Sequence, residues 1–263
     1  MKKLIGSMII CTILSGCATM AKLDQLVKKP QVNFDSIGLG QVTASNIELK
    51  PKFNVTNPNS FPIPVDSIDY TLSFNEQVLV HGASDKIGTL SPNIAKPITL
   101  GINITDDVLS NLHDNLIKTN KVAYKVAGNV KVMGLSLPFE HAATLFKPQV
   151  NITNFRIEKA NLNSIDVVLK LAINNPNQFT IPLDNIRYSV TAKGQYIVKG
   201  SLMNQQIEKG TNVITVPLSL ASGKLVANVL ALLKSPSVPL QIQVTSPMFS
   251  LSQQHTLNLS SLL

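Results

Sequence analysis

The ten residues "VTNPNSFPIP", Val55–Pro64, predict a rigid corner at the end of a strand. Proline fixes its own φ angle and pushes the preceding residue, Asn57, into an extended conformation. Asparagine side chains also hydrogen-bond to neighbouring backbone groups. We expect Phe61 to anchor this corner to the core, because an aromatic ring beside a rigid turn usually packs inward. The corner returns as "INNPNQFTIP" at Ile173–Pro182, with Phe179 in the place of Phe61.

The two corners belong to a tandem duplication with an offset of 118 residues. The string "KPQVN" occurs at Lys29–Asn33 and again at Lys147–Asn151, and 19 of the 56 positions from 29 to 84 are identical to their partners. We therefore predict two domains, residues 29–146 and 147–263. The predicted structural motif consists of Asn57, Pro58, Asn59 and Phe61, and of Asn175, Pro176, Asn177 and Phe179.

The composition predicts that both halves fold. Hydrophobic residues make up 44% of the chain and charged residues 14%, whereas an average soluble protein has about 25% charged residues. A disordered chain shows the opposite balance. Each copy is also within the usual size range of an independent domain.

Alternating hydrophobicity around each corner predicts antiparallel strands. The residues expected on the apolar face are Ile47, Leu49, Phe53 and Val55 in the first copy, and Ile165, Val167, Leu169, Leu171 and Ile173 in the second. Further strands are expected at Gln77–Val80, Pro97–Ile104, Val122–Val132 and Leu135–Leu145. The predicted fold class is mostly β, with two tandem antiparallel β-sandwich domains.

One segment in each copy has helical spacing instead. Asp106–Lys118 places Val108, Leu109, Leu112, Leu116 and Ile117 on one face, and Thr105 is the candidate N-cap. Ser222–Lys234 is its counterpart. Such an apolar stripe covers an open edge or end of a sandwich, or it lies in a membrane interface.

The first residues predict an export signal. Lys2 and Lys3 precede an apolar stretch that is shorter than the roughly 20 residues of a membrane-spanning helix. Leu14–Cys17, "LSGC", resembles the lipobox of bacterial lipoproteins. That resemblance implies a signal peptide at residues 1–16, an acylated Cys17 and a tether at residues 17–28. The alternative is an ordinary secretory signal with an incidental cysteine.

The same resemblance implies a location in the bacterial cell envelope. Ala18, directly after the cysteine, resembles the signal for outer-membrane retention, so we expect an outer-membrane protein that faces the periplasm. Acylated Cys17 would make the membrane a partner. The formal charge is +8, the basic residues are spread singly apart from Lys28-Lys29, and the aromatic content is 5% with no tryptophan. Nucleic-acid binders cluster basic and aromatic residues, so we do not expect nucleic acid as a partner.

The Asn-Pro-Asn corner carries a second resemblance. A long alternating strand, this corner, an "I-x-Y" strand from Ile68 to Tyr70 and a glycine at Gly82 recur in the second copy. The pattern resembles the water-stress-and-hypersensitive-response (WHy) domain of late-embryogenesis-abundant group 2 proteins. The resemblance implies fibronectin type III-like sandwiches with one helix each, a role in desiccation, cold or water-stress tolerance, and no catalysis.

No catalytic or metal-binding motif stands out. The four histidines, His81, His113, His141 and His255, have no metal-ligand spacing, and no nucleophile elbow, P-loop or calcium loop is present. We expect a non-enzymatic protein without a cofactor that protects stress-sensitive client proteins or lipid. The alternatives are a binding module for lipid or another apolar ligand, and an interaction scaffold in the envelope.

Overall fold

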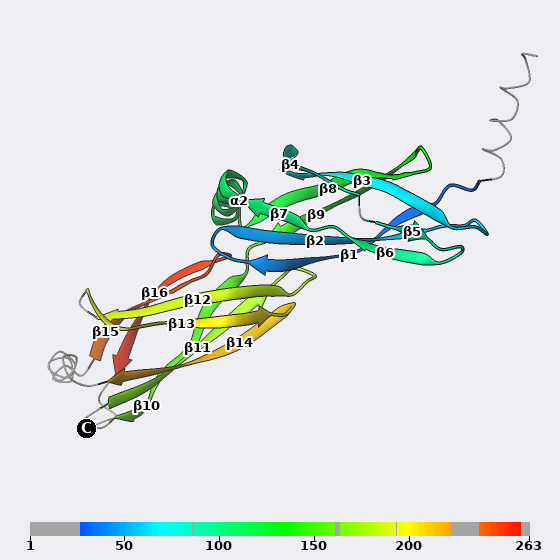
Figure 1. Ribbon diagram of the computed structural model, residues 1–263. Coiled ribbons are helices and arrows are strands. Elements are labelled where there is room, and N and C mark those ends of the chain that lie inside the picture. The colour runs from blue at the N-terminus through cyan, green and yellow to red at the C-terminus, as the bar shows by residue number, and fades with distance from the viewer. Residues whose placement is uncertain (1–26, 86, 161–163, 193, 222–236, 259–263) are drawn as a thin grey trace, which may run out of the picture.

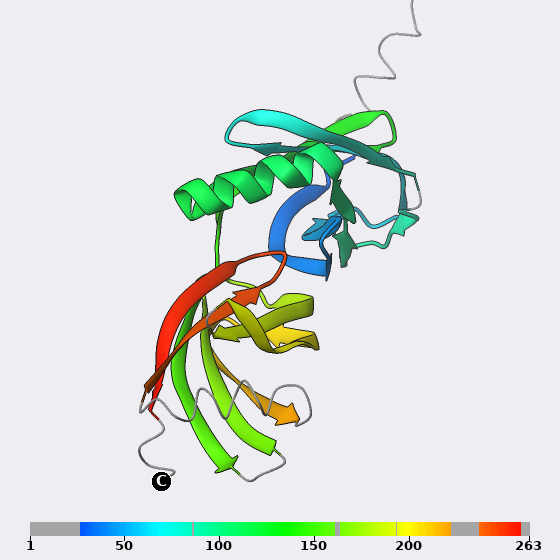
Figure 2. The same ribbon diagram turned by 90° about the vertical axis from the view of Figure 1, so that its left-hand side faces the viewer.

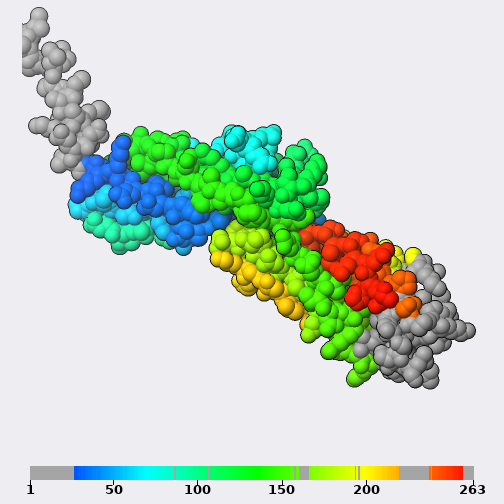
Figure 3. Space-filling view, turned by 180° about the vertical axis from the view of Figure 1, so that it is seen from behind, coloured from blue at the N-terminus to red at the C-terminus, as the bar shows by residue number. Residues whose placement is uncertain are grey.

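The computed structural model describes residues 27–85, 87–160, 164–192, 194–221 and 237–258. Strands of these residues form four antiparallel sheets, two in each half of the chain (Figure 1). In every strand pair of the described residues, both partners come from the same half. The described residues are mostly β. The two halves stand end to end and form an elongated body (Figure 3).

The first half contains two sheets and one helix. One sheet has the order β1-β2-β6, with β7 also paired to β2, and the other has the order β4-β3-β8-β9, with β5 paired to β3. The elements are β1 (Gln31–Val42), β2 (Asn46–Thr56), β3 (Ile63–Phe74), β4 (Gln77–Ser84), β5 (Thr89–Leu90), β6 (Ala95–Thr99), β7 (Ile102–Thr105), α2 (Asp106–Thr119), β8 (Lys121–Val132) and β9 (Leu135–Phe146).

The second half repeats this arrangement with fewer, longer strands. Its sheets have the orders β10-β11-β14 and β13-β12-β15-β16. The strands are β10 (Gln149–Ala160), β11 (Ser164–Asn175), β12 (Ile181–Ala192), β13 (Gln195–Ile207), β14 (Gly210–Ala221), β15 (Ser237–Thr245) and β16 (Ser250–Asn258). The predicted helix Ser222–Lys234 lies outside the described residues, and α2 is the one helix within them.

The apolar faces predicted from alternation form the cores. The predicted residues of β2 are 0–5% exposed, and those of β11 from Val167 to Ile173 are 0–2% exposed. Between the sheets of the first half, Phe53 of β2 packs on Phe139 of β9 with ring centroids 4.4 Å apart. The space lined by these two rings, Val55, Ile68 and Val130 admits no water-sized sphere. This part of the core is therefore filled by side chains.

A proline explains why the predicted strand Pro97–Ile104 is broken into β6 and β7. Pro51 lies inside β2 and has no N–H group to donate to a neighbouring strand. The ladder between β2 and β6 runs as far as Lys52 and Thr99, and pairing resumes with β7 at Leu49. In the second half Leu169 occupies the equivalent position, and β14 pairs with β11 without interruption.

Helix α2 covers the end of the first sandwich that faces the second half (Figure 2). Leu112 and Leu116 are 1% and 3% exposed, and Val108 and Leu109 also pack against the core. The inclusion of Ile117 in this face was wrong, because its side chain is 53% exposed. Thr105 precedes the helix in an extended conformation but makes no side-chain capping hydrogen bond.

The two halves meet through a very short junction. Only Lys147 and Pro148 separate β9 from β10. The Lys147 N–H donates a 2.9 Å hydrogen bond to the carbonyl of Asn120, the residue that ends α2. Strand β1 of the first half lies against β12 of the second. The junction is thus held by backbone hydrogen bonds and strand contacts rather than by a long linker.

Candidate functional site

Asn57 organises the first corner through four hydrogen bonds. Its Nδ2 donates to the carbonyls of Phe61 at 2.7 Å and Leu90 at 3.2 Å. Its Oδ1 accepts from the backbone N–H of Asn59 at 3.0 Å and from the Asn59 Nδ2 at 2.9 Å. The side chain is fully buried, and an asparagine amide has two donor hydrogens and one acceptor oxygen with two lone pairs. Asn57 therefore uses its whole hydrogen-bonding capacity inside the fold.

Asn59 connects this corner to the chain that enters the domain. Its Nδ2 donates to the carbonyl of Lys28 at 2.7 Å, and its Oδ1 accepts the Lys28 N–H at 2.8 Å. An amide side chain that bonds both backbone groups of one residue substitutes for a strand partner. The point at which the chain enters the first domain is thereby fixed.

The second corner reproduces the same network. Asn175 donates to the carbonyls of Phe179 at 2.8 Å and Ile207 at 3.0 Å, and its Oδ1 accepts from both nitrogens of Asn177. Asn177 forms the backbone pair with Phe146, with both hydrogen bonds at 2.9 Å. Phe146 is the last residue of β9. The second corner therefore holds the junction between the domains, as the first corner holds Lys28.

The two corner phenylalanines differ in how far they pack into the core. Phe61 is 38% exposed, so the expectation that it anchors the corner to the core was wrong. Phe179 is partly buried and packs against the core. The corner closes through the backbone carbonyls of these residues, which accept hydrogen bonds from Asn57 and Asn175. Because the buried asparagines hold the turn, the ring of Phe61 is left free to point outward.

The glycine of the "I-x-Y" pattern also has a structural explanation. Tyr70 of β3 pairs with Gly82 of β4, and Tyr188 of β12 pairs with Gly200 of β13. A Cβ atom on Gly82 would lie 2.2 Å from the Tyr70 ring. The tyrosine therefore lies across the glycine of the neighbouring strand, which requires a residue without a side chain there.

His141 and His255 occupy matching positions in the two repeats, and each contacts an aromatic ring of the facing sheet. The His141 ring of β9 stacks on Phe34 of β1, with centroids 3.5 Å apart and planes 5° from parallel. Its Nε2 lies 3.4 Å from the hydroxyl of Tyr124. Burial lowers the pKa of His141 and raises the pKa of Tyr124 to about 12, since both charged forms lose water contact. In the second domain His255 meets Phe155 edge-on at 5.5 Å.

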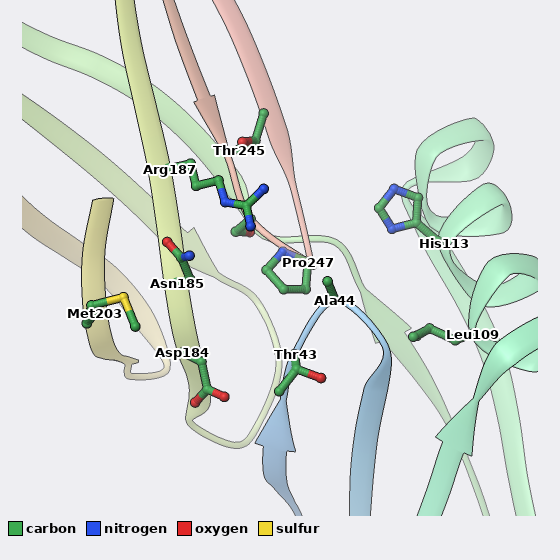
Figure 4. A pocket seen from close by; sticks show the side chains of 11 residues that line it. Thr43, Ala44, Leu109, His113, Asp184, Asn185, Arg187, Met203, Thr245 and Pro247 are labelled. Atoms are coloured by element: carbon green, nitrogen blue, oxygen red, sulfur yellow. The ribbon is translucent and has the colours of Figure 1, made fainter. Parts of the chain in front are cut away.

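A hollow of about 480 Å³ lies between the two domains (Figure 4). The first domain contributes the β1–β2 turn and α2, and the second contributes β12, β13 and the turn after β15. Arg187 and His113 lie on opposite walls (Figure 4). The amide oxygen of Asn185 is buried there without a hydrogen-bond partner. No local sequence pattern indicates this hollow, because residues from five separate segments form it.

Other predicted features are placed as follows. Cys17 and the predicted signal peptide lie outside the described residues. Among the described residues, no helix is long and apolar enough to cross a membrane, and no three His, Cys, Asp or Glu side chains cluster as metal ligands. His81 is exposed on β4, and His113 is exposed on α2.

Comparison with known proteins gives relatives of similar sequence. Over 103 residues, the chain is 25% identical to an uncharacterized protein of Methanocaldococcus jannaschii, covering 38% of this chain and 59% of the relative. Over 83 residues, it is 24% identical to the desiccation protectant protein Lea14 homolog of Glycine max, covering 31% of this chain and 55% of the relative. The chain thus spans little more than half the length of these relatives.

A solution structure from Arabidopsis thaliana aligns with 46% of this chain and 83% of its own, at 19% identity and a TM-score of 0.40. The family profile gives the broader match. The profile of the late embryogenesis abundant protein family LEA_2 matches twice, at residues 52–142 and 170–260. Each match contains one asparagine corner and the strands that surround it. The chain therefore belongs to the LEA_2 family of late embryogenesis abundant proteins and carries two such domains in tandem.

Proposed function

We propose that this protein is a non-catalytic protectant that limits damage to neighbouring proteins or membrane lipid during desiccation, cold or water stress. The observation that carries the proposal is the LEA_2 match to both halves of the chain. The soybean relative's name, desiccation protectant protein, supports it. The proposal also gives each half a fibronectin type III-like architecture.

We further propose that the protein acts from the bacterial cell envelope, anchored through lipid on Cys17. The support is the "LSGC" sequence at Leu14–Cys17 and the short apolar stretch before it. One acyl chain binds a bilayer only marginally, whereas several chains on one residue give lasting attachment. Ala18 favours the outer membrane, with the body in the periplasm.

Gene deletion with complementation tests both parts of this function. Cells without the gene should survive drying or freeze–thaw less well, and wild-type protein should restore survival. Complementation with Cys17→Ser separates anchoring from protection, because it removes the acylated thiol and leaves both LEA_2 domains intact. Equal survival of deleted and wild-type cells under all these stresses would contradict a protective role.

A binding module for lipid or another apolar ligand is the second candidate, and the interdomain hollow favours it. Leu109, Met203 and Pro247 supply apolar walls, and the Asn185 oxygen lacks a donor. Its volume is within the range of small-molecule sites. The space between the sheets of the first domain does not favour this function, since it is filled. Native mass spectrometry of wild type and Met203→Trp would show a bound ligand that the variant loses.

A further inference from the structure

Four segments of the first domain, three loops and the incoming chain, meet at the end farthest from the second domain (Figure 1). Asn57 bridges to Pro92 and accepts the Asn93 N–H at 2.8 Å, which joins the corner to the loop before β6. Val65 pairs with Val132, which places the β8–β9 turn beside the start of β3. Lys28 enters the domain there, next to Asn59. We call this region the entry end.

Each of the three loops exposes a large apolar side chain. Phe61 of the corner is 38% exposed, Ile94 of the loop before β6 is 60% exposed, and Met133 of the β8–β9 turn is 50% exposed. Single exposed apolar residues are common on soluble proteins. Here three adjacent loops at one end of the molecule each carry one. This grouping calls for a physical explanation.

The backbone conformation at Met133 is unfavourable for a methionine. Met133 and Gly134 have φ angles of +48° and +75° and form the two-residue turn between β8 and β9. Such turns strongly prefer asparagine or aspartate followed by glycine, because other side chains are strained at positive φ. Methionine is therefore a poor residue for the turn itself. A strained residue that persists at an exposed tip suggests a functional role for its side chain.

The corresponding end of the second domain is different because it faces the first domain. Phe179 packs against the core there, and Gly210 occupies the position of Ile94. The turn after β15 contains Met248 and Phe249, which are only 2% and 3% exposed. Exposed apolar tips thus occur at the corner that does not face the other LEA_2 domain.

We propose that the entry end is a membrane-contact surface, with Phe61, Ile94 and Met133 inserted among the headgroups of a phospholipid bilayer. This proposal rests on the proposed anchoring of Cys17. Eleven residues, 18–28, lead from that cysteine to Lys28, the residue that Asn59 clamps. Fully extended, they reach at most about 40 Å. The entry end is therefore the part of the body held nearest to the lipid.

A bilayer fits these tips better than a protein partner does. Specific protein interfaces need about 800 Å² of complementary surface on each side, whereas these three side chains project from separate loops. Single apolar side chains insert into a membrane interface without such complementarity. Lys28 and Lys29 are exposed beside them and suit lipid phosphates. Asp66 is exposed on β3 nearby, so the apolar tips and not net charge carry the contact.

The absence of tryptophan from the sequence allows a direct test. Phe61→Trp would place a single fluorophore at the entry end, and Tyr196→Trp would place one on β13 at a residue that is 65% exposed. Each full-length lipidated protein is reconstituted into vesicles whose acyl chains carry bromine, which quenches nearby tryptophan. We expect Trp fluorescence at position 61 to fall by about twofold or more, as for a side chain at the acyl boundary. Position 196 should be unaffected.

A second variant tests whether the tips act together. With Ile94→Trp as the probe, adding Phe61→Ser and Met133→Ser should remove most of the quenching. Adding Tyr196→Ser and Val213→Ser should not, although those residues of the second domain are 65% and 63% exposed. Equal quenching in both backgrounds would overturn the proposal, because the tips would then not determine the contact.

The outcomes separate this proposal from the anchoring of Cys17. If the protein floats with vesicles but position 61 is unquenched, the anchor stands and the contact surface is overturned. If Cys17→Ser protein floats equally well with position 61 quenched, the anchor fails and the contact surface stands. Unquenched position 61 with crosslinks between copies would assign the entry end to a second copy of the chain, which overturns the proposal.

Discussion

The two asparagine corners have the same hydrogen bonds but fix different segments of the chain. Asn59 clamps Lys28, where the chain enters the first domain, and Asn177 clamps Phe146, where it enters the second. The corner of the second domain is therefore part of an internal junction, whereas the first faces outward. The comparison suggests that the corner is a general device for fixing an incoming chain.

The largest expected effect comes from removing the centre of either network. Asn57→Ala or Asn175→Ala deletes four hydrogen bonds, two of which the side chain donates to backbone carbonyls. At about 1 kcal/mol for each bond, either change should lower the free energy of unfolding by about 4 kcal/mol. Hydrogen exchange of the full chain, measured by mass spectrometry, would locate the loss in the domain that carries the change.

The matched control is Asn103→Ala on β7, where the asparagine is exposed and its loss should be nearly neutral. Equal losses in the two domains would support a shared structural role for the corners. A cost below about 1 kcal/mol for Asn57→Ala would mean that water replaces the network at the outward-facing corner, and the comparison between the two corners would break there.

The clamps themselves should have a smaller effect on stability and a different effect on shape. Asn59→Ala and Asn177→Ala each lose two hydrogen bonds to an incoming backbone and one to the central asparagine. We expect the free energy of unfolding to fall by about 2 kcal/mol in either case. The backbone N–H of the clamp residue keeps its hydrogen bond to the central asparagine, and water can replace part of the lost side-chain bonds. Only Asn177→Ala should widen the distribution of distances between the domains.

Spin labels on exposed β4 and β13 positions, Val78→Cys and Tyr196→Cys, would measure that distribution in the full chain with Cys11 and Cys17 replaced by serine. The Asn59→Ala protein is the control, since its clamp lies at the other end of the first domain. An unchanged distribution in Asn177→Ala would show that the Lys147–Asn120 hydrogen bond and the β1–β12 contact hold the junction without the clamp.

Truncating the corner phenylalanines should reduce stability by different amounts in the two domains. Truncating a fully buried phenylalanine to alanine lowers the free energy of unfolding by about 3–5 kcal/mol. Phe179 is only partly buried, so Phe179→Ala should cost about 1–2 kcal/mol, and Phe61→Ala should cost less than about 1 kcal/mol. Urea unfolding of the full chain followed by circular dichroism would compare them. A larger cost at Phe61 would restore the anchoring role that its exposure argues against.

Local patterns predicted much of this fold because their causes are local. Alternation placed Ile47, Leu49 and Val55 correctly in the core, and helical spacing placed Leu112 and Leu116 correctly on the buried face of α2. The proline and the asparagines correctly indicated a turn stabilised by side-chain hydrogen bonds. The offset between the copies allowed each inference to be checked against its counterpart.

The failures have non-local causes. The strand Pro97–Ile104 is split by Pro51, which lies on a neighbouring strand and almost 50 residues away in the chain. The burial of Phe61 and Phe179 differs because one corner faces a second domain and the other does not. The asparagine clamps join residues 31 positions apart, and the interdomain hollow joins both domains. No window of local sequence contains these pairs.

The smallest expected effect concerns pH and distinguishes the stacked histidine of the first domain from its counterpart. Burial lowers the pKa of His141 below its ordinary value of 6.5. As the pH falls through 6.5, the unfolded chain takes up a proton on this residue while the folded domain does not. Protons then favour unfolding, so the free energy of unfolding should decrease from pH 7 toward pH 5.

His141→Phe should remove this contribution and keep the ring that stacks on Phe34. Thermal melts at pH 5 and pH 7.5 should therefore differ less in the variant than in the wild type, and NMR titration should give His141 a pKa below 6.5. His255→Phe is the matched control, because that ring meets Phe155 edge-on and not face to face. If His141→Phe leaves the pH dependence unchanged, protonated His141 is accommodated between Phe34 and Tyr124 as readily as in water. The stacked contact would then differ from the edge-on contact in geometry alone, without a consequence for stability.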